Sequence, residues 1–150
     1  MMNRYVLSAT SLVSILLLAS LAGCGRGDKA AASSGDLVAD VVDAYLKGMG
    51  GQGSMSNPGE LGKQRNEALA EAIGAALARH SSAEPELQTQ VKALQDLAQQ
   101  AAQAYAVGLE RYRAGAPPRE WQQAAMFVAQ IEAGLRALPG AAEKLPPADF

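Results

Sequence analysis

The sequence is poor in the residues from which most catalytic and metal sites are built. Its 150 residues include one cysteine and one histidine, and aromatic residues make up 5%. A single cysteine excludes an internal disulfide, so packing must stabilise the fold. The lone His80 excludes a metal site with two histidines. A Ser–His–Asp triad would have to pair His80 with Ser81 or Ser82, which are adjacent in sequence and badly placed for it. We therefore expect no catalytic set, no metal, no other cofactor and no enzymatic activity.

A strong excess of basic charge is also missing. The formal net charge is −2, whereas nucleic-acid-binding proteins usually carry a basic patch, so nucleic acid is not an expected partner. Strand-forming residues are sparse after the first 20 residues and do not alternate over a useful length. Hydrophobic residues make up 49%, but many of them are alanine, the strongest helix former. The composition predicts an all-α protein with a thin, closely packed core.

The first 25 residues have the organisation of a secretory signal. A short positive segment with Arg4 precedes a mostly apolar stretch over residues 6–21. This stretch is shorter than the roughly 20 apolar residues of a spanning helix. It ends in Leu21-Ala22-Gly23-Cys24, which resembles the lipobox of bacterial lipoproteins at every position.

This resemblance, confined to the first 25 or so residues, implies a lipid anchor. The Cys24 thiol would receive a diacylglyceryl group, signal peptidase II would recognise Leu21, Ala22 and Gly23 and cleave before Cys24, and the freed amine would be acylated with a fatty acid such as palmitate. One acyl chain binds a membrane only marginally, whereas two or three make a stable anchor. The alternatives are an ordinary signal peptide with a chance cysteine, or a buried structural cysteine. The resemblance also implies a location, because an aspartate directly after the lipidated cysteine would favour retention in the inner membrane. Gly25 at this position therefore favours the outer membrane, with the domain facing the periplasm.

The remaining chain divides into a tether, a domain and a tail. Residues 1–23 are expected to be removed as the signal peptide. The residues that follow, 24–35, are small and polar, as is typical of a flexible tether. Residues 36–140 form the predicted helical domain. Residues 141–150 contain two adjacent prolines and are predicted to be a loose tail.

Apolar residues recur at helical spacing in four segments, which predicts four helices. Short turns between the last three favour a small antiparallel four-helix bundle. The expected helices run from residue 36 to the glycines that begin at residue 48, from 57 to about 79, from about 84 to 114 and from about 118 to 138.

Several residues mark the expected helix ends. Asp36 and Asn57 are suited to cap the first and second helices, and Pro58 suits a first helical position. Ser81 or Ser82 is the expected cap of the third helix. His80 is expected at the C-terminal end of the second helix, near its negative dipole end.

Residues typical of binding surfaces gather around the predicted last turn. Trp, Tyr and Arg are enriched in binding hot spots. If the last two helices are antiparallel, these residues meet at one end of the bundle. The candidate partner-binding residues, here called the Arg/Tyr cluster, are Tyr105, Arg111, Tyr112, Arg113, Arg119 and Trp121. The alternative interpretation is that Trp121 and the tyrosines belong to the core and that the arginines form its rim.

The leading functional hypothesis is a membrane-anchored, non-enzymatic lipoprotein that binds another envelope protein through its helix faces. An assembly or pilotin-like factor and an immunity protein against an envelope toxin are both open. The alternative is a periplasmic carrier of a lipid or other apolar ligand, in which the glycine-rich segment 48–56 lets the first helix swing as a lid. The sequence does not decide whether residues 36–49 pack on the bundle.

Overall fold

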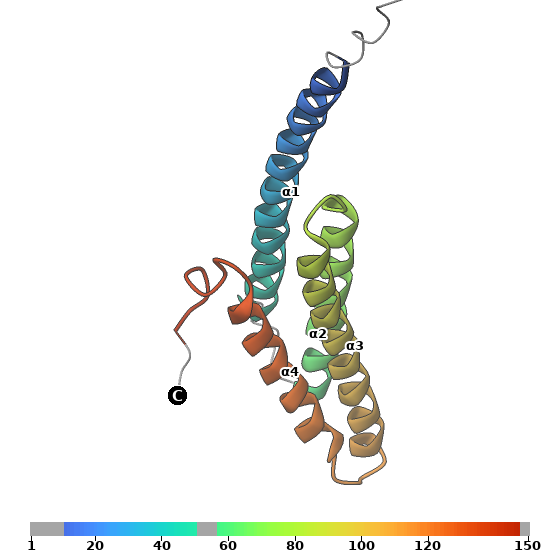
Figure 1. Cartoon of the computed structure of the whole chain (residues 1–150). Coiled ribbons are helices and arrows are strands. Elements are labelled where there is room, and N and C mark those ends of the chain that lie inside the picture. The colour runs from blue at the N-terminus through green and yellow to red at the C-terminus, as the bar shows by residue number, and fades with distance from the viewer. Residues whose placement is uncertain (1–10, 51–56, 148–150) are drawn as a thin grey trace, which may run out of the picture.

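The protein is an all-α four-helix bundle. The computed structural model describes the backbone of residues 11–50 and 57–147 and the side chains of residues 29–48 and 57–147. The helices within these ranges are α1 (Ser11–Gly50), α2 (Pro58–Arg79), α3 (Pro85–Arg113) and α4 (Glu120–Ala137). Consecutive helices run in opposite directions (Figure 1), so the predicted fold class is confirmed.

The antiparallel pair α2 and α3 is the hairpin on which the other two helices pack (Figure 1). Glycines at the seam let the two helices approach closely, because a Cβ at Gly62 or Gly74 of α2 would fall too close to Tyr105 or Gln95 of α3. The Gln95 Nε2 of α3 reaches across this seam and donates to the Ala70 carbonyl of α2 at 3.0 Å. The buried residues of the seam include Leu69, Ile73 and Ala76 of α2 and Leu87, Val91, Leu94 and Ala98 of α3.

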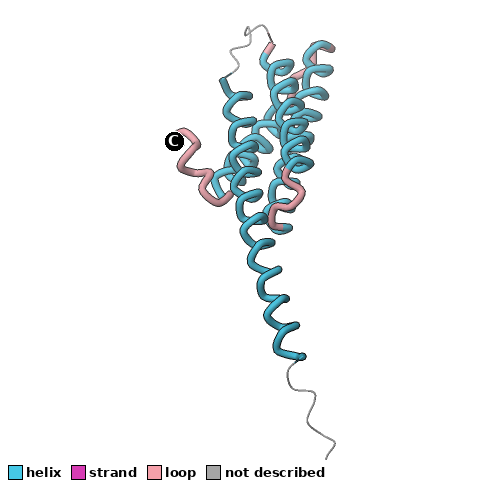
Figure 2. Tube along the Cα trace, turned by 90° about the horizontal axis from the view of Figure 1, so that it is seen from above, coloured by secondary structure: helices cyan, strands magenta, loops and turns pink. Residues whose placement is uncertain are grey.

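The C-terminal half of α1 is part of the core, which the sequence had left open. Five of its side chains are at most 7% exposed, namely Leu37, Val38, Val41, Val42 and Tyr45. Polar contacts join the same stretch to the end of α2, because Asp40 Oδ2 lies 2.9 Å from His80 Nε2 and 3.2 Å from an Arg79 guanidinium nitrogen. The N-terminal part of α1 continues beyond the other three helices (Figure 2).

The start of the first helix differs from the sequence prediction. The whole of the predicted tether, residues 24–35, lies within α1, which begins at Ser11, and Asp36 therefore lies within the helix and does not cap it. Three consecutive alanines at residues 30–32 favour helix. The Ser34 Oγ also accepts a hydrogen bond from the Glu84 backbone N–H at 3.0 Å, which ties this turn of α1 to the start of α3.

One predicted helix cap is confirmed and another is wrong. The Asn57 Oδ1 accepts from the backbone N–H groups of Gly59 and Glu60 at 3.1 and 3.3 Å. At the start of α3, however, the N-cap is Glu84 and not Ser81 or Ser82, and its side chain makes no capping bond. Ser34 of α1 accepts from the N–H of the N-cap residue itself, so it joins α1 to the start of α3 without taking the capping role expected of the local serines.

The segment after α4 also differs from the prediction of a loose tail. Ala141 and Leu145 are buried, and the Arg136 Nη2 donates to the Pro146 carbonyl at 2.7 Å. The apolar side chains and this hydrogen bond hold residues 141–147 against the bundle. The last three residues of the chain, 148–150, lie outside the described residues.

None of the helices within the described part of the chain combines the length and apolar character that crossing a membrane requires. The apolar stretch 6–21 belongs to the predicted signal peptide, and its side chains lie outside the described residues.

The burial of α1 predicts a large cost for truncating Leu37, which is 0% exposed. We expect Leu37→Ala to lower the free energy of unfolding by about 2–5 kcal/mol, because it removes buried apolar contacts and leaves a cavity. Urea denaturation followed by circular dichroism measures this change. Asp43→Ala, at an exposed position of the same helix, should change the value by less than about 0.5 kcal/mol. Equal effects of the two substitutions would show that α1 does not pack as described.

Candidate functional site

The Arg/Tyr cluster lies at one end of the bundle, where α2 begins, α3 ends and α4 begins (Figure 1). The rings of Tyr112 and Trp121 are in contact, with centroids 5.7 Å apart and planes inclined by 32°. Tyr112 is 57% exposed, whereas Trp121 is half-buried. The structure therefore brings together aromatic residues that the sequence could only place near the same turn.

Trp121 packs between two glycines and joins three helices. A Cβ atom at Gly59 of α2 or at Gly108 of α3 would fall too close to the indole ring, so each glycine is required for this close approach. The indole Nε1 also donates to the Tyr105 carbonyl of α3 at 3.4 Å. Tyr105 itself is half-buried against Gly62 of α2. These contacts favour the interpretation in which Trp121 and Tyr105 belong to the packing of the bundle.

Two arginines of the cluster form ion pairs with acidic residues in the first turns of neighbouring helices. Arg111 Nη1 lies 2.9 Å from Glu120 Oε1 of α4, and Arg113 Nη2 lies 3.1 Å from Glu60 Oε2 of α2. Arg119 is exposed and has no ion-pair partner among the described residues. The cluster thus presents an exposed tyrosine ring and one uncompensated guanidinium. Sequence reasoning missed Glu60 and the two glycines that seat Trp121.

The residues of the predicted lipid-attachment site are Leu21, Ala22, Gly23 and Cys24. Their side chains lie outside the described residues. The assignment of Cys24 as the lipidated residue stays a prediction from the sequence.

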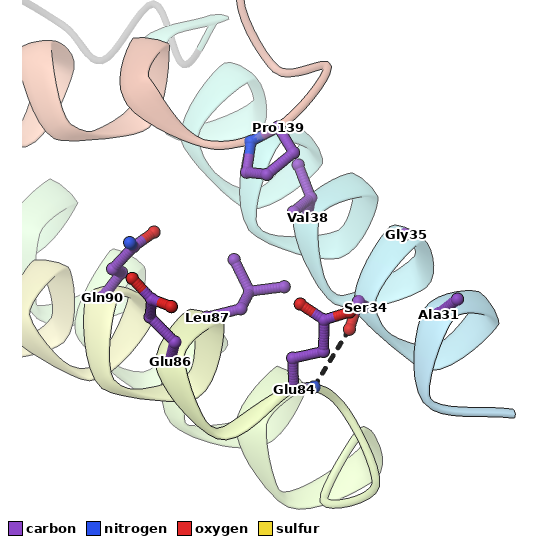
Figure 3. A pocket seen from close by; sticks show the side chains of 9 residues that line it. All are labelled: Ala31, Ser34, Gly35, Val38, Glu84, Glu86, Leu87, Gln90 and Pro139. Carbon is purple, nitrogen blue, oxygen red and sulfur yellow. Dashed lines mark hydrogen bonds between the residues drawn. The ribbon is translucent and has the colours of Figure 1, made fainter. Parts of the chain in front are cut away.

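A cavity of about 480 Å³ lies between α1 and the start of α3. Its apolar wall includes Val38 of α1, Leu87 of α3 and Pro139, which follows α4 (Figure 3). The exposed side chains of Glu84 and Glu86 also line the cavity. Its volume falls within the range of roughly 300–1,000 Å³ typical of small-molecule sites.

A second, smaller cavity of about 120 Å³ lies where the C-terminal half of α1 meets the other three helices. Tyr45 lines it, and burial raises the pKa of the Tyr45 hydroxyl; nearby Glu132 also raises it, whereas Arg136 lowers it. Asn66 lines it too and is buried, with its Nδ2 donating to the Gly62 carbonyl at 2.8 Å. The volume is well below the usual range for ligand pockets, so this cavity cannot hold a lipid chain.

His80 lies where the sequence predicted it, as the C-cap residue of α2. Its contact with Asp40 of α1 was not predicted, because the two residues are 40 positions apart. Among the described side chains, no group of three or more His, Cys, Asp or Glu residues is arranged to hold a metal ion.

The packing of the Trp121 indole against Gly108 predicts that Gly108→Ala destabilises the bundle. A methyl group there would push against the indole, and overpacking of this kind typically costs about 1–3 kcal/mol. Alanine would otherwise stabilise a helix by about 1 kcal/mol relative to glycine. We therefore expect urea denaturation to show a loss of stability, and the emission of the single tryptophan to shift to longer wavelength as its ring is displaced.

The matched control is Gly35→Ala in α1, where a Cβ would meet nothing within 4 Å. This variant should be as stable as the parent or more stable, with unchanged emission. If Gly108→Ala behaved in the same way, Trp121 would not occupy the position described.

No protein-family model, curated protein or solved structure matches the chain. The functional proposal therefore rests on the described residues and on the lipobox-like sequence that ends in Cys24.

Proposed function

We propose that the protein is a lipid-anchored, non-enzymatic lipoprotein of the bacterial cell envelope that binds another envelope protein through its helix faces. The observation that carries the proposal is the exposed Tyr112 ring, which rests on the fixed indole of Trp121 at the end of the bundle. A rigid aromatic residue loses little conformational entropy when a partner covers it. Aromatic residues next to arginines are the usual components of binding hot spots.

The proposed partner offers an apolar contact to Tyr112 and a carboxylate to Arg119. The guanidinium of Arg119 is exposed, whereas Arg111 and Arg113 are engaged by Glu120 and Glu60. The two ion pairs link the end of α3 to the first turns of α2 and α4, next to Tyr112. An assembly or pilotin-like factor and an immunity protein against an envelope toxin could each use such a surface. Neighbouring genes for secretion machinery or for a toxin would discriminate between them.

The proposed anchor is supported by the lipobox-like sequence that ends in Cys24. The part of α1 that follows Cys24 is fixed to the bundle by five buried side chains. Its N-terminal part leaves the bundle at the end opposite the Arg/Tyr cluster (Figure 1). Lipid chains on Cys24 would therefore hold the domain with the cluster facing away from the membrane.

A carrier of an apolar ligand is the second candidate, supported by the apolar wall of the cavity between α1 and α3. The movement of α1 as a lid is costly, however. Swinging it away would expose Leu37, Val41 and three further buried side chains, at roughly 1.5–3 kcal/mol for each large one. Native mass spectrometry of the purified protein tests the carrier, and a stoichiometric bound lipid other than the covalent anchor would favour it over the partner-binding proposal.

The anchor predicts that Cys24→Ser abolishes incorporation of labelled palmitate and releases the protein from the membrane pellet. The thiol is the group that accepts the lipid, and a serine hydroxyl does not replace it. Ser33→Ala is the control and should be labelled and sedimented like the parent. Absence of label from the parent chain, or normal labelling of Cys24→Ser, would contradict the proposal.

The partner surface predicts that Tyr112→Ala lowers recovery of a cross-linked envelope partner by at least about ten-fold, as expected when a hot-spot residue is truncated. The partner is identified by mass spectrometry after cross-linking in cells. Tyr112 is the appropriate position because Trp121→Ala would also remove packing and lower stability by about 3–5 kcal/mol.

Thr89→Ala, at an exposed position near the other end of α3, serves as the control and should leave recovery unchanged. Circular dichroism should show that both variants are folded. Equal recovery with Tyr112→Ala and Thr89→Ala would remove the cluster as the binding surface.

A further inference from the structure

Two neighbouring helices share a surface without charged residues. Residues 97–109 of α3 and 121–131 of α4 contain no Asp, Glu, Lys or Arg, although charged residues make up 19% of the chain. The two helices are antiparallel and lie side by side (Figure 1), so the uncharged stretches face the same region. Exposed helix faces are normally the places where charges concentrate.

The surface between these stretches is hollowed and partly apolar. A groove of about 340 Å³ is lined by Val107 and three glutamines, and Met126 nearby is 63% exposed. Met126 and Val107 are two of the three large hydrophobic residues that are exposed in the described part of the chain. We define the neutral α3/α4 face by Gln100, Gln103, Val107, Gln123, Met126 and Phe127. Glu120, at the edge of the groove, is already paired with Arg111.

This face is left uncovered because α4 packs on the bundle along a narrow stripe. Of its 18 residues, only Ala124, Ile131 and Leu135 are buried. The end of α1 meets the same two stretches on a different side, where Tyr45 of α1 lines the small cavity with Tyr105 and Val128, and none of these residues lines the groove. An uncharged, partly apolar and exposed face is typical of the central part of a protein interface.

We propose that the neutral α3/α4 face binds the same face of a second copy of the chain. In a two-fold contact every residue meets the same surface of its partner, so any charged group on the axis would meet its like. A face without charges avoids this repulsion. The amide of each glutamine is both donor and acceptor, so Gln100, Gln103 and Gln123 can pair with their counterparts while Val107, Met126 and Phe127 exclude water.

A strongly charged partner would find no opposite charge on this face, whereas a second copy brings the same uncharged glutamines and apolar side chains to it. The size of the face indicates how strong the dimer is. Two helices about 10 Å apart with uncharged stretches roughly 20 Å long present on the order of 400 Å². Because this is about half of what a standard interface buries per partner, the dimer should be weak and dependent on concentration.

Cysteine cross-linking of the full chain tests the proposal, because Cys24 is the only natural cysteine. Met126→Cys places an exposed thiol at the α4 edge of the face, one turn from Gln123, and oxidation should give a covalent dimer. Adding Gln123→Glu to this chain places a carboxylate on each of the two facing surfaces, and the yield of dimer should fall at least five-fold. Glu71→Cys, exposed on α2, is the matched control for random collisions, and the chain without a new cysteine reports any dimer formed through Cys24.

Cross-linking of Met126→Cys no stronger than that of Glu71→Cys would overturn the proposal. So would an unchanged yield with Gln123→Glu, or a cross-linked product that contains a different protein. Analytical ultracentrifugation of the parent chain and Met126→Glu gives a second test, in which only the parent should show a dimer at high concentration. Tyr112→Ala should leave the dimer intact, so failure of the proposed partner surface and failure of this dimer are distinguishable.

Discussion

Close approach between helices, made possible by small residues, is the constraint on which the rest of the structure depends. Gly62 and Gly74 of α2 leave space for side chains of α3, and Gly59 and Gly108 leave the space that the Trp121 ring fills. Small side chains bury little apolar area each, so the bundle cannot rely on a thick core. Its stability therefore depends on the few large residues that the seams admit and on the accuracy with which they fit.

The two ends of the bundle are held by different means. At the end near the start of α3, four segments meet, and α1 is held by buried valines, by the contact of Asp40 with His80 and by the bond from Glu84 to Ser34. At the other end only α2, α3 and α4 meet, and a single indole together with two ion pairs replaces the fourth helix. Because the indole is fixed on two sides, the tyrosine ring that rests on it is held in place although it is exposed.

The features that the sequence predicted well are local ones. The second, third and fourth helices lie within about two residues of their predicted bounds because Pro58, Pro85 and the Gly115-Ala116-Pro117-Pro118 turn impose breaks that any tertiary structure must respect.

The features that the sequence did not predict depend on partners distant in the chain. The turn of α1 that contains Ser34 is joined to Glu84, and the packing of residues 141–147 depends on Arg136 and on burial of Leu145. Similarly, the arginines and aromatic residues of the cluster were visible in the sequence. The glycine seat of Trp121 and the pairing of Arg113 with Glu60 required the register of α2 against α3, which no local pattern encodes.

A membrane anchor would change the balance of the weak contacts proposed for this domain. A face of about 400 Å² gives little affinity in free solution, but confinement of two copies to one surface raises their effective concentration without any new contact. The neutral face lies along the side of α3 and α4, whereas the Arg/Tyr cluster lies at the end of the bundle. Two anchored copies in contact along their sides would therefore present two Tyr112 rings toward the same side, away from the membrane. A partner with a repeated binding site would engage both rings, and the second contact would form at the effective concentration set by the dimer. The neutral α3/α4 face would thus form a weak dimer, and the dimer would strengthen binding of the partner to the Arg/Tyr cluster.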